Sequence, residues 1–159
     1  MFRFWARFAS ARAPSPHDQP LAALEDRDFN RAEQELTALL TRATAPLERA
    51  FLLNKRGVAR VAMQQTELAR EDFTAATECA GGFAPALTNL ANLLLEEGEI
   101  GAAIARYERA ILADPNYALA HFNLGAAYKR AGRFADAVRA LRRAQRLEKP
   151  TFSVRRRPP

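Results

Sequence analysis

The stretch Ala118-Leu-Ala-His-Phe-Asn-Leu-Gly-Ala-Ala-Tyr128 decides the fold, because the chain repeats its small and large residues at a step of about 34 residues. Three copies can be laid in register from Ala50, Ala84 and Ala118. Equivalent positions keep their size in the sets Gly57, Ala91 and Gly125; Ala69, Ala103 and Ala137; Phe73, Tyr107 and Leu141; and Ala76, Ala110 and Ala144. Such a unit is typical of one helix-turn-helix, which buries its apolar face only when neighbouring units stack on it.

The third copy also carries Gly132 and Phe134, and the second keeps Leu87, Leu90, Leu94, Gly98, Ile100 and the closing Asp114-Pro115. With these residues the chain resembles the tetratricopeptide repeat (TPR) family over residues 50–149. The first copy departs from the pattern, since Arg56 and Arg60 occupy apolar positions and Gly81-Gly82 replaces the closing proline. The resemblance implies an all-α, right-handed superhelical solenoid of antiparallel helix-turn-helix repeats, with repeats at 50–83, 84–117 and 118–149.

Elementary chemistry explains the same spacing. Glycine at 57 and 125 permits close helix approach, and Gly98 and Gly132 supply the positive φ that ends each first helix. Upstream, residues 21–45 match only the second helix of a repeat, so we expect a half-repeat or capping hairpin there. Residues 1–20 are expected to form an amphipathic arm followed by an extended proline-rich linker, and residues 150–159 a basic tail.

The residues for reaction chemistry are scarce. The two histidines, His17 and His121, have no convincing partner in the sequence, and a single cysteine, Cys79, cannot form an internal disulfide. We expect Cys79 to be a buried thiol and His121 to be packed in its repeat. The segment Gly98-Glu-Ile-Gly101 lacks the Lys-Ser/Thr ending of a phosphate loop. The sequence therefore predicts no catalytic residue, no metal site and no cofactor, and a protein that is not an enzyme.

Charge is concentrated at one end of the chain. Residues 121–159 hold eleven Lys or Arg against two Asp or Glu, within a total formal charge of +6. A terminal repeat keeps its uncovered face polar, which is the simplest explanation. The alternative is that this basic third binds RNA, an anionic membrane or an acidic protein. Few aromatic side chains lie in the repeats for base stacking, which disfavours nucleic acid.

The ends of the chain suggest attachment points. Phe4, Trp5 and Phe8 would share one face of a helix, with Arg3 and Arg7 opposite. Such an arm could lie at a membrane surface, dock on a partner, direct the chain to an organelle, or fold back on its own solenoid. The tail offers Arg155, Arg156 and Arg157. No apolar run spans a bilayer, so we expect a cytoplasmic protein, of bacterial source by its composition, with peripheral membrane association and organelle targeting left open.

Recognition is expected on the concave face, which the first helix of each repeat lines. The resemblance places these partner-binding candidates there: Asn54, Lys55 and Val58, Thr88, Asn89 and Asn92, and Phe122, Asn123, Ala126, Lys129 and Arg130. Asn89 and Asn123 are register-equivalent, and their carboxamides could pair with the main chain of an extended peptide. Some family members instead clamp a terminal carboxylate, which only Asn92, Lys129 and Arg130 match. We therefore predict an adaptor or scaffold that holds an extended or helical, preferably acidic, protein segment, within a larger assembly.

Overall fold

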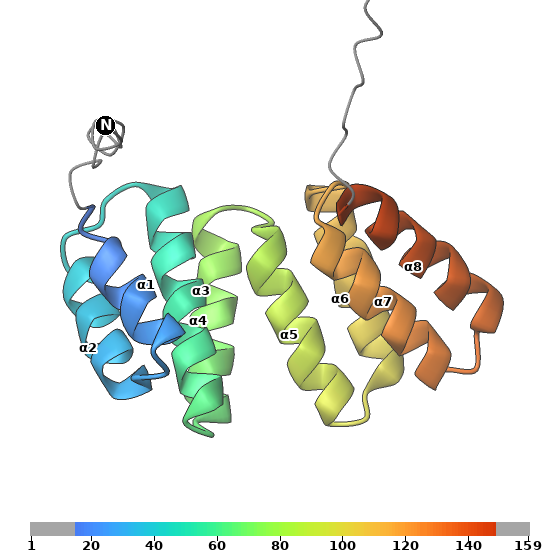
Figure 1. The fold of residues 1–159 in the computed structure, drawn as a ribbon, viewed down its shortest axis with the longest axis horizontal. Helices are drawn as coiled ribbons and strands as arrows, with labels where there is room; N and C mark the ends of the chain where they lie inside the picture. Colours follow the sequence, from blue (N-terminus) through green and yellow to red (C-terminus); the bar gives the residue numbers. More distant parts are fainter. Residues whose placement is uncertain (1–14, 149–159) are drawn as a thin grey trace, which may run out of the picture.

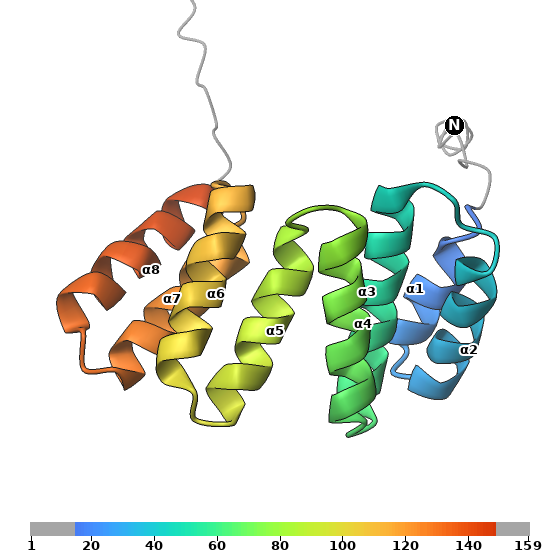
Figure 2. The ribbon, with the colours of Figure 1, turned by 180° about the vertical axis from the view of Figure 1, so that it is seen from behind.

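The computed structural model describes residues 15–148, and every regular element in that range is an α-helix. The helices are α1 (Asp18–Glu25), α2 (Phe29–Leu40), α3 (Pro46–Ala62), α4 (Thr66–Cys79), α5 (Ala84–Glu96), α6 (Ile100–Ala113), α7 (Ala118–Arg130) and α8 (Phe134–Glu148). They form hairpins that stack in a row, with α1 and α2 at one end and α7 and α8 at the other (Figures 1 and 2). The predicted all-α repeat solenoid is confirmed.

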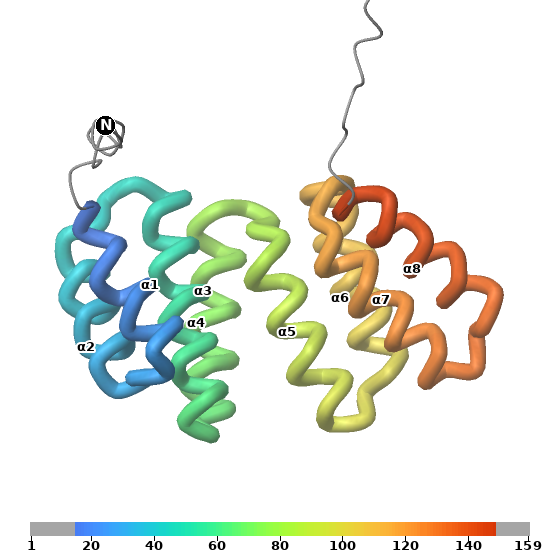
Figure 3. Tube along the Cα trace, in the orientation of Figure 1, coloured from blue at the N-terminus to red at the C-terminus, as the bar shows by residue number. Residues whose placement is uncertain are grey.

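Consecutive helices form hairpins, and the hairpins stack. Helices α3 and α4, α5 and α6, and α7 and α8 make the most extensive contacts, and each hairpin then packs on the next through α4 with α5 and α6 with α7. The tube in Figure 3 shows the chain running up and down the row without crossing itself. Each helix therefore contacts near neighbours in sequence, as the repeat pattern requires.

Positive φ angles mark the turn inside every hairpin. Gly98 (φ 86°) and Gly132 (φ 73°) adopt the left-handed conformation that the sequence predicts for them. The two upstream turns place non-glycine residues in the same conformation, Arg27 at φ 60° and Gln64 at φ 62°. The turn geometry is thus shared by all four hairpins, although only two of them use glycine.

Close helix contact explains the small residues inside the repeats. A Cβ atom added to Gly57 would lie 2.5 Å from Cε1 of Phe73, and one added to Gly125 would lie 2.7 Å from Cγ of Leu141. Side chains at these two positions would collide with the second helix of the same hairpin. The predicted role of both glycines is confirmed.

The buried side chains form a core that follows the row of helices. One cluster joins α1 to α5 and includes Leu36, Leu52 and Phe73. A second joins α5 to α8 around Tyr107 and Leu124. Because α5 contributes to both clusters, it connects the two halves of the stack.

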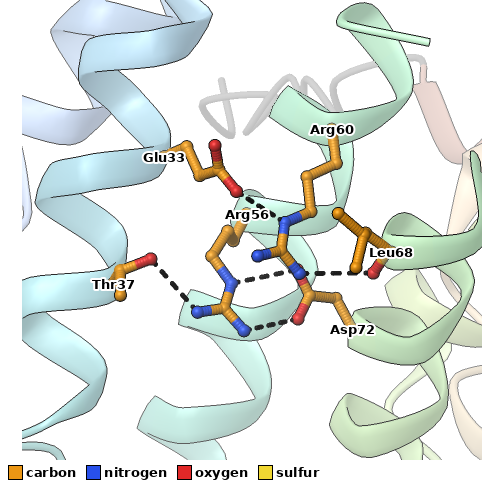
Figure 4. A network of polar contacts seen from close by, with 6 residues as sticks. All are labelled: Glu33, Thr37, Arg56, Arg60, Leu68 and Asp72. Carbon is orange, nitrogen blue, oxygen red and sulfur yellow. Dashed lines mark hydrogen bonds and ion pairs between the residues drawn. The ribbon is translucent and has the colours of Figure 1, made fainter. Parts of the chain in front are cut away.

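A buried ion-pair network accounts for the unusual first repeat (Figure 4). Asp72 is almost fully buried, and its two carboxylate oxygens accept hydrogen bonds from Arg56 (2.6 and 3.0 Å) and from Arg60 (2.9 Å). Arg60 also donates to Glu33 of α2 at 2.8 Å, and Arg56 donates to Thr37 at 3.1 Å. The two arginines at apolar positions are therefore accommodated by carboxylates on α2 and α4.

Two expectations are wrong. Residues 18–20, which we assigned to an extended linker, form the first turn of α1, and Pro20 is buried there. Proline is tolerated at that place because the first four amides of a helix have no partner within the helix. Cys79 is partly exposed rather than buried, since it is the last residue of α4 and the helix ends beside it.

Candidate functional site

A hollow of about 430 Å³ opens between the first helices of two successive hairpins. Val58, Val61 and Ala62 of α3 line one side of it, and Asn89, Asn92 and Glu96 of α5 line the other. Arg27 and Phe29, at the start of α2, close one end. We call this hollow, with these lining residues, the α3–α5 groove.

Carboxamides link the first helices of neighbouring hairpins. Asn89 Nδ2 donates to Asn54 Oδ1 at 2.8 Å, and Asn123 Nδ2 donates to Asn92 Oδ1 at 2.9 Å. The Tyr107 hydroxyl donates to the same Asn92 oxygen at 2.6 Å. The four asparagines therefore hold successive repeats in register, and two of them, Asn89 and Asn92, also line the groove.

After these bonds are made, two polar atoms in the groove still have no hydrogen-bond partner within residues 15–148. Asn92 Oδ1 already accepts two hydrogen bonds, but its amide nitrogen has no hydrogen-bond partner among residues 15–148. Asn89 has the complementary arrangement, since its nitrogen donates to Asn54 while its oxygen has no partner in that range. One side of the groove thus offers a donor and an acceptor less than one helical turn apart, which is the pair that a peptide main chain needs.

The rest of the groove is apolar, with charge at its edges. Val58 and Val61 are exposed to solvent there. The Arg27 guanidinium lies 6.0 Å from the centre of the Phe29 ring. Burial raises the pKa of Tyr107 behind Asn92 to about 12, Glu96 adds to the rise, and Arg130 opposes it. Sequence reasoning missed Arg27, Phe29, Val61 and Glu96; exposed valines three residues apart on α3 were the available signal.

Three of the expected partner-binding positions do not line the groove. Asn54 and Thr88 are buried, contrary to the expectation that they are exposed. Their register equivalent, Phe122, is exposed and lines a separate depression with Val138 and Leu141 of α8. The physical reason is that this helix position is covered wherever another hairpin follows, and no described hairpin follows α7 and α8.

The basic candidates are spread over the molecule. Lys55 places Nζ 5.5 Å from the centre of the Phe51 ring, and Arg130 donates to the carbonyl oxygen of Leu95 at 2.9 Å. Lys129 and Ala126 are exposed. Within residues 15–148, neither Lys55 nor Lys129 forms a hydrogen bond with the asparagines. The arm residues Phe4, Trp5 and Phe8 and the tail residues Arg155, Arg156 and Arg157 lie outside the described residues.

The histidines have structural surroundings. His17 Nε2 lies 3.2 Å from Glu48 Oε1, and its ring stacks at a tilt on Phe51, so the expectation that it lacks a partner is wrong. The partner comes from the start of α3, thirty-one residues away in sequence. His121 Nε2 lies 3.0 Å from the Pro115 carbonyl oxygen. Within residues 15–148 we find no group of three potential metal-ligating side chains and no helix long and apolar enough to cross a membrane.

Comparisons with known proteins agree with this architecture. A TPR repeat model matches residues 91–132, and a tetratricopeptide repeat model matches residues 118–150. No curated protein sequence is significantly similar to the chain.

Several solved structures share the fold. A crystal structure of MamA has a TM-score of 0.66 at 22% identity, over 81% of this chain and 74% of that one. YrrB, described as a TPR protein with an unusual peptide-binding site, has a TM-score of 0.62 at 20% identity, over 84% and 67%. The second TPR of Spaghetti (RPAP3), bound to the HSP90 peptide SRMEEVD, has a TM-score of 0.58 at 25% identity, over 63% and 93%. The chain therefore carries tetratricopeptide repeats within residues 91–150, and residues 15–148 have the helical repeat fold of these solved structures.

Proposed function

We propose that this chain is a non-catalytic adaptor that holds a segment of another protein in the α3–α5 groove. TPR proteins are generally interaction modules rather than catalysts. Of the structural neighbours, one is bound to a peptide and another has a peptide-binding site. The observation that carries the proposal is that the Asn89 oxygen and the Asn92 nitrogen have no hydrogen-bond partner within residues 15–148 and lie in the same groove as exposed Val58 and Val61.

The groove suggests how a peptide would be held. An extended main chain presents a carbonyl and an amide in alternation, so one residue could accept from Asn92 and donate to Asn89. A side chain next to that residue would then cover Val58 and Val61, which removes apolar surface from water. Main-chain recognition supplies affinity without demanding a particular sequence, and the apolar hollow supplies selectivity.

We further propose a preference for acidic segments near the third repeat. Lys129 and Arg130 are exposed at the end of α7. The peptide bound by the Spaghetti repeat, SRMEEVD, contains three acidic residues. The arm residues Phe4, Trp5 and Phe8 and the triple arginine of the tail are proposed as secondary attachments within a larger assembly.

Peptides selected from a displayed random library against the full chain would test the groove. Isothermal titration should show that Val58→Glu weakens the selected peptides by at least about tenfold, because a carboxylate replaces the apolar floor and disfavours its coverage. The control is Leu112→Glu, which introduces the same charge at a strongly exposed leucine of α6 outside the groove. If every selected peptide binds the Val58→Glu protein as well as the wild type, the groove is not the binding site.

The alternative function, association with RNA or an anionic membrane, is supported by the arginines of α8. Arg139, Arg142 and Arg146 line a shallow depression of about 520 Å³. Phosphate contacts release counterions, so binding of polyuridine RNA or phosphatidylserine vesicles should weaken steeply as salt is raised. No binding of either probe at low salt would remove this alternative.

A further inference from the structure

The outer side of the last hairpin exposes apolar side chains where the preceding repeat buries the equivalent residues. Phe122 is 52% exposed, Val138 46% and Leu141 38%. Their register equivalents one repeat earlier are Thr88, Ile104 and Tyr107, and all three are buried. The last hairpin therefore carries apolar residues in place of the polar side chains that would finish a solenoid.

These side chains form one surface. Phe122 of α7 and Val138, Leu141 and Ala144 of α8 line a depression of about 370 Å³, which we call the terminal face. Helix α8 stands at the end of the row and packs chiefly against α7 (Figures 1 and 2). The terminal face is distinct from the α3–α5 groove, since the two share no residue.

The charges around the terminal face favour an acidic occupant. Arg142 and one carboxylate, Glu148, line the depression, and Arg146 follows Arg142 one turn later on α8. Neither guanidinium is within ion-pair distance of a carboxylate among residues 15–148, whereas the exposed Arg139 is paired with Asp136. Residues 118–148 as a whole hold seven Lys or Arg against two Asp or Glu.

The same charges disfavour the ends of this chain as occupants. Residues 149–159 contain four basic residues and no acidic residue, so the arginines of α8 would repel them. Residues 1–14 are apolar enough to cover the face, but they carry three arginines and no acidic residue. The N-terminal arm of a second copy would therefore place its arginines beside Arg142 and Arg146, and the positive charges would repel one another.

We infer that the terminal face binds an amphipathic helix of another protein, with apolar side chains over Phe122, Val138 and Leu141 and carboxylates beside Arg142 and Arg146. A helix fits because the equivalent surface of the preceding hairpin is covered by helix α7, which packs on both α5 and α6. The bound helix takes the place that the first helix of a further repeat would take. Its carboxylates would pair with two arginines that form no ion pair within residues 15–148, although Glu148 also lines the depression.

Two synthetic peptides test this inference with the full chain. The first is a capped helix with leucines repeating at helical spacing and glutamates on both flanks, and the second replaces every glutamate with lysine. Fluorescence anisotropy should show the glutamate peptide binding at least about tenfold more tightly than the lysine peptide. Reversing both arginines, Arg142→Glu with Arg146→Glu, should invert that preference.

Single substitutions locate the binding site. Val138→Glu should weaken the glutamate peptide by at least about tenfold, while Leu112→Glu, at a strongly exposed leucine of α6 outside the face, should leave it unchanged. Val58→Glu in the groove should also leave it unchanged. If Val58→Glu removes binding and Val138→Glu does not, the peptide occupies the groove, so this inference fails while the proposed function stands.

Other occupants would each overturn the inference in a recognisable way. Sedimentation of the wild type as a dimer that Val138→Glu converts to a monomer would assign the face to a second copy. Binding of the glutamate peptide only after Phe152→Ser would assign it to residues 149–159. Equal binding of the two peptides, or complete displacement of the glutamate peptide by polyuridine RNA, would show that acidic helices are not what this face recognises.

Discussion

Asp72 shows how one residue can decide the stability of a repeat. Its nearly buried carboxylate compensates both Arg56 and Arg60. Asp72→Ala would leave two guanidinium groups without their shared partner in a place with little water, and we expect the free energy of unfolding to fall by about 3–5 kcal/mol. Urea denaturation measures this loss. Asp136→Ala, which breaks more exposed ion pairs on α8, should cost much less.

A triple substitution separates lost charge compensation from lost packing. The equivalents of Arg56 in the later repeats are Leu90 and Leu124, and the equivalent of Asp72 in the last repeat is Ala140. Arg56→Leu and Arg60→Leu, added to Asp72→Ala, should therefore recover much of the stability that Asp72→Ala removes. A triple variant as unstable as the single one would show that the network is not what holds α2, α3 and α4 together.

Tyr107, at the centre of the stack, makes a pH-dependent contribution to the stability of the fold. Burial raises its pKa in the folded state to about 12, above the value near 10 of an unfolded chain. The neutral phenol therefore stabilises the fold fully below pH ~10, and this contribution is lost as the pH rises towards 12. A spectrophotometric phenolate titration should show a late step near pH 12 that Tyr107→Phe removes. Survival of the step in that variant would assign it to Tyr117 or Tyr128, whose pKa values burial also raises.

At the scale of helices, periodicity predicted most of the structure. Small residues at the crossings and glycines in the turns located α3 to α8, because both features are required by the packing of one hairpin. Helix α1 was expected only within one of two alternatives, a capping hairpin at residues 21–45, and its first three residues were assigned to the linker. It has eight residues, too few to show a helical period, and the prolines around it are typical of a linker. Its place is determined by contacts with α2, which sequence spacing does not report.

The direction in which each helix presents its side chains was harder to predict. An α-helix turns about 100° per residue, so neighbouring positions on α5 serve different surfaces. Thr88 is buried, whereas Asn89 and Asn92 line the groove. The repeat fixes which helices line the concave face, but the rotation of each helix about its axis follows from packing. This is why Asn89 and Asn92 line the groove while Asn54, Thr88 and Phe122 do not. That any of them binds a partner stays a prediction.

For the whole molecule, the stack predicts an order of local opening. Helix α8 packs chiefly against α7, and no hairpin beyond it lies within residues 15–148, whereas α5 contributes to both core clusters. Stability in repeat proteins is close to a sum of nearest-neighbour terms, so α8 should open more readily than α5. Native-state hydrogen exchange should show the amides of α8 exchanging first. Slower exchange in α8 than in α5 would contradict this nearest-neighbour description.

The separation between the α3–α5 groove and the terminal face has a consequence for stoichiometry. The two surfaces use different helices, so one copy has room for two ligands at the same time. If both ligands belong to a single polypeptide, the second attachment becomes intramolecular, and avidity exceeds either affinity without any new contact. If they belong to different proteins, each copy is a bivalent bridge that joins one of each.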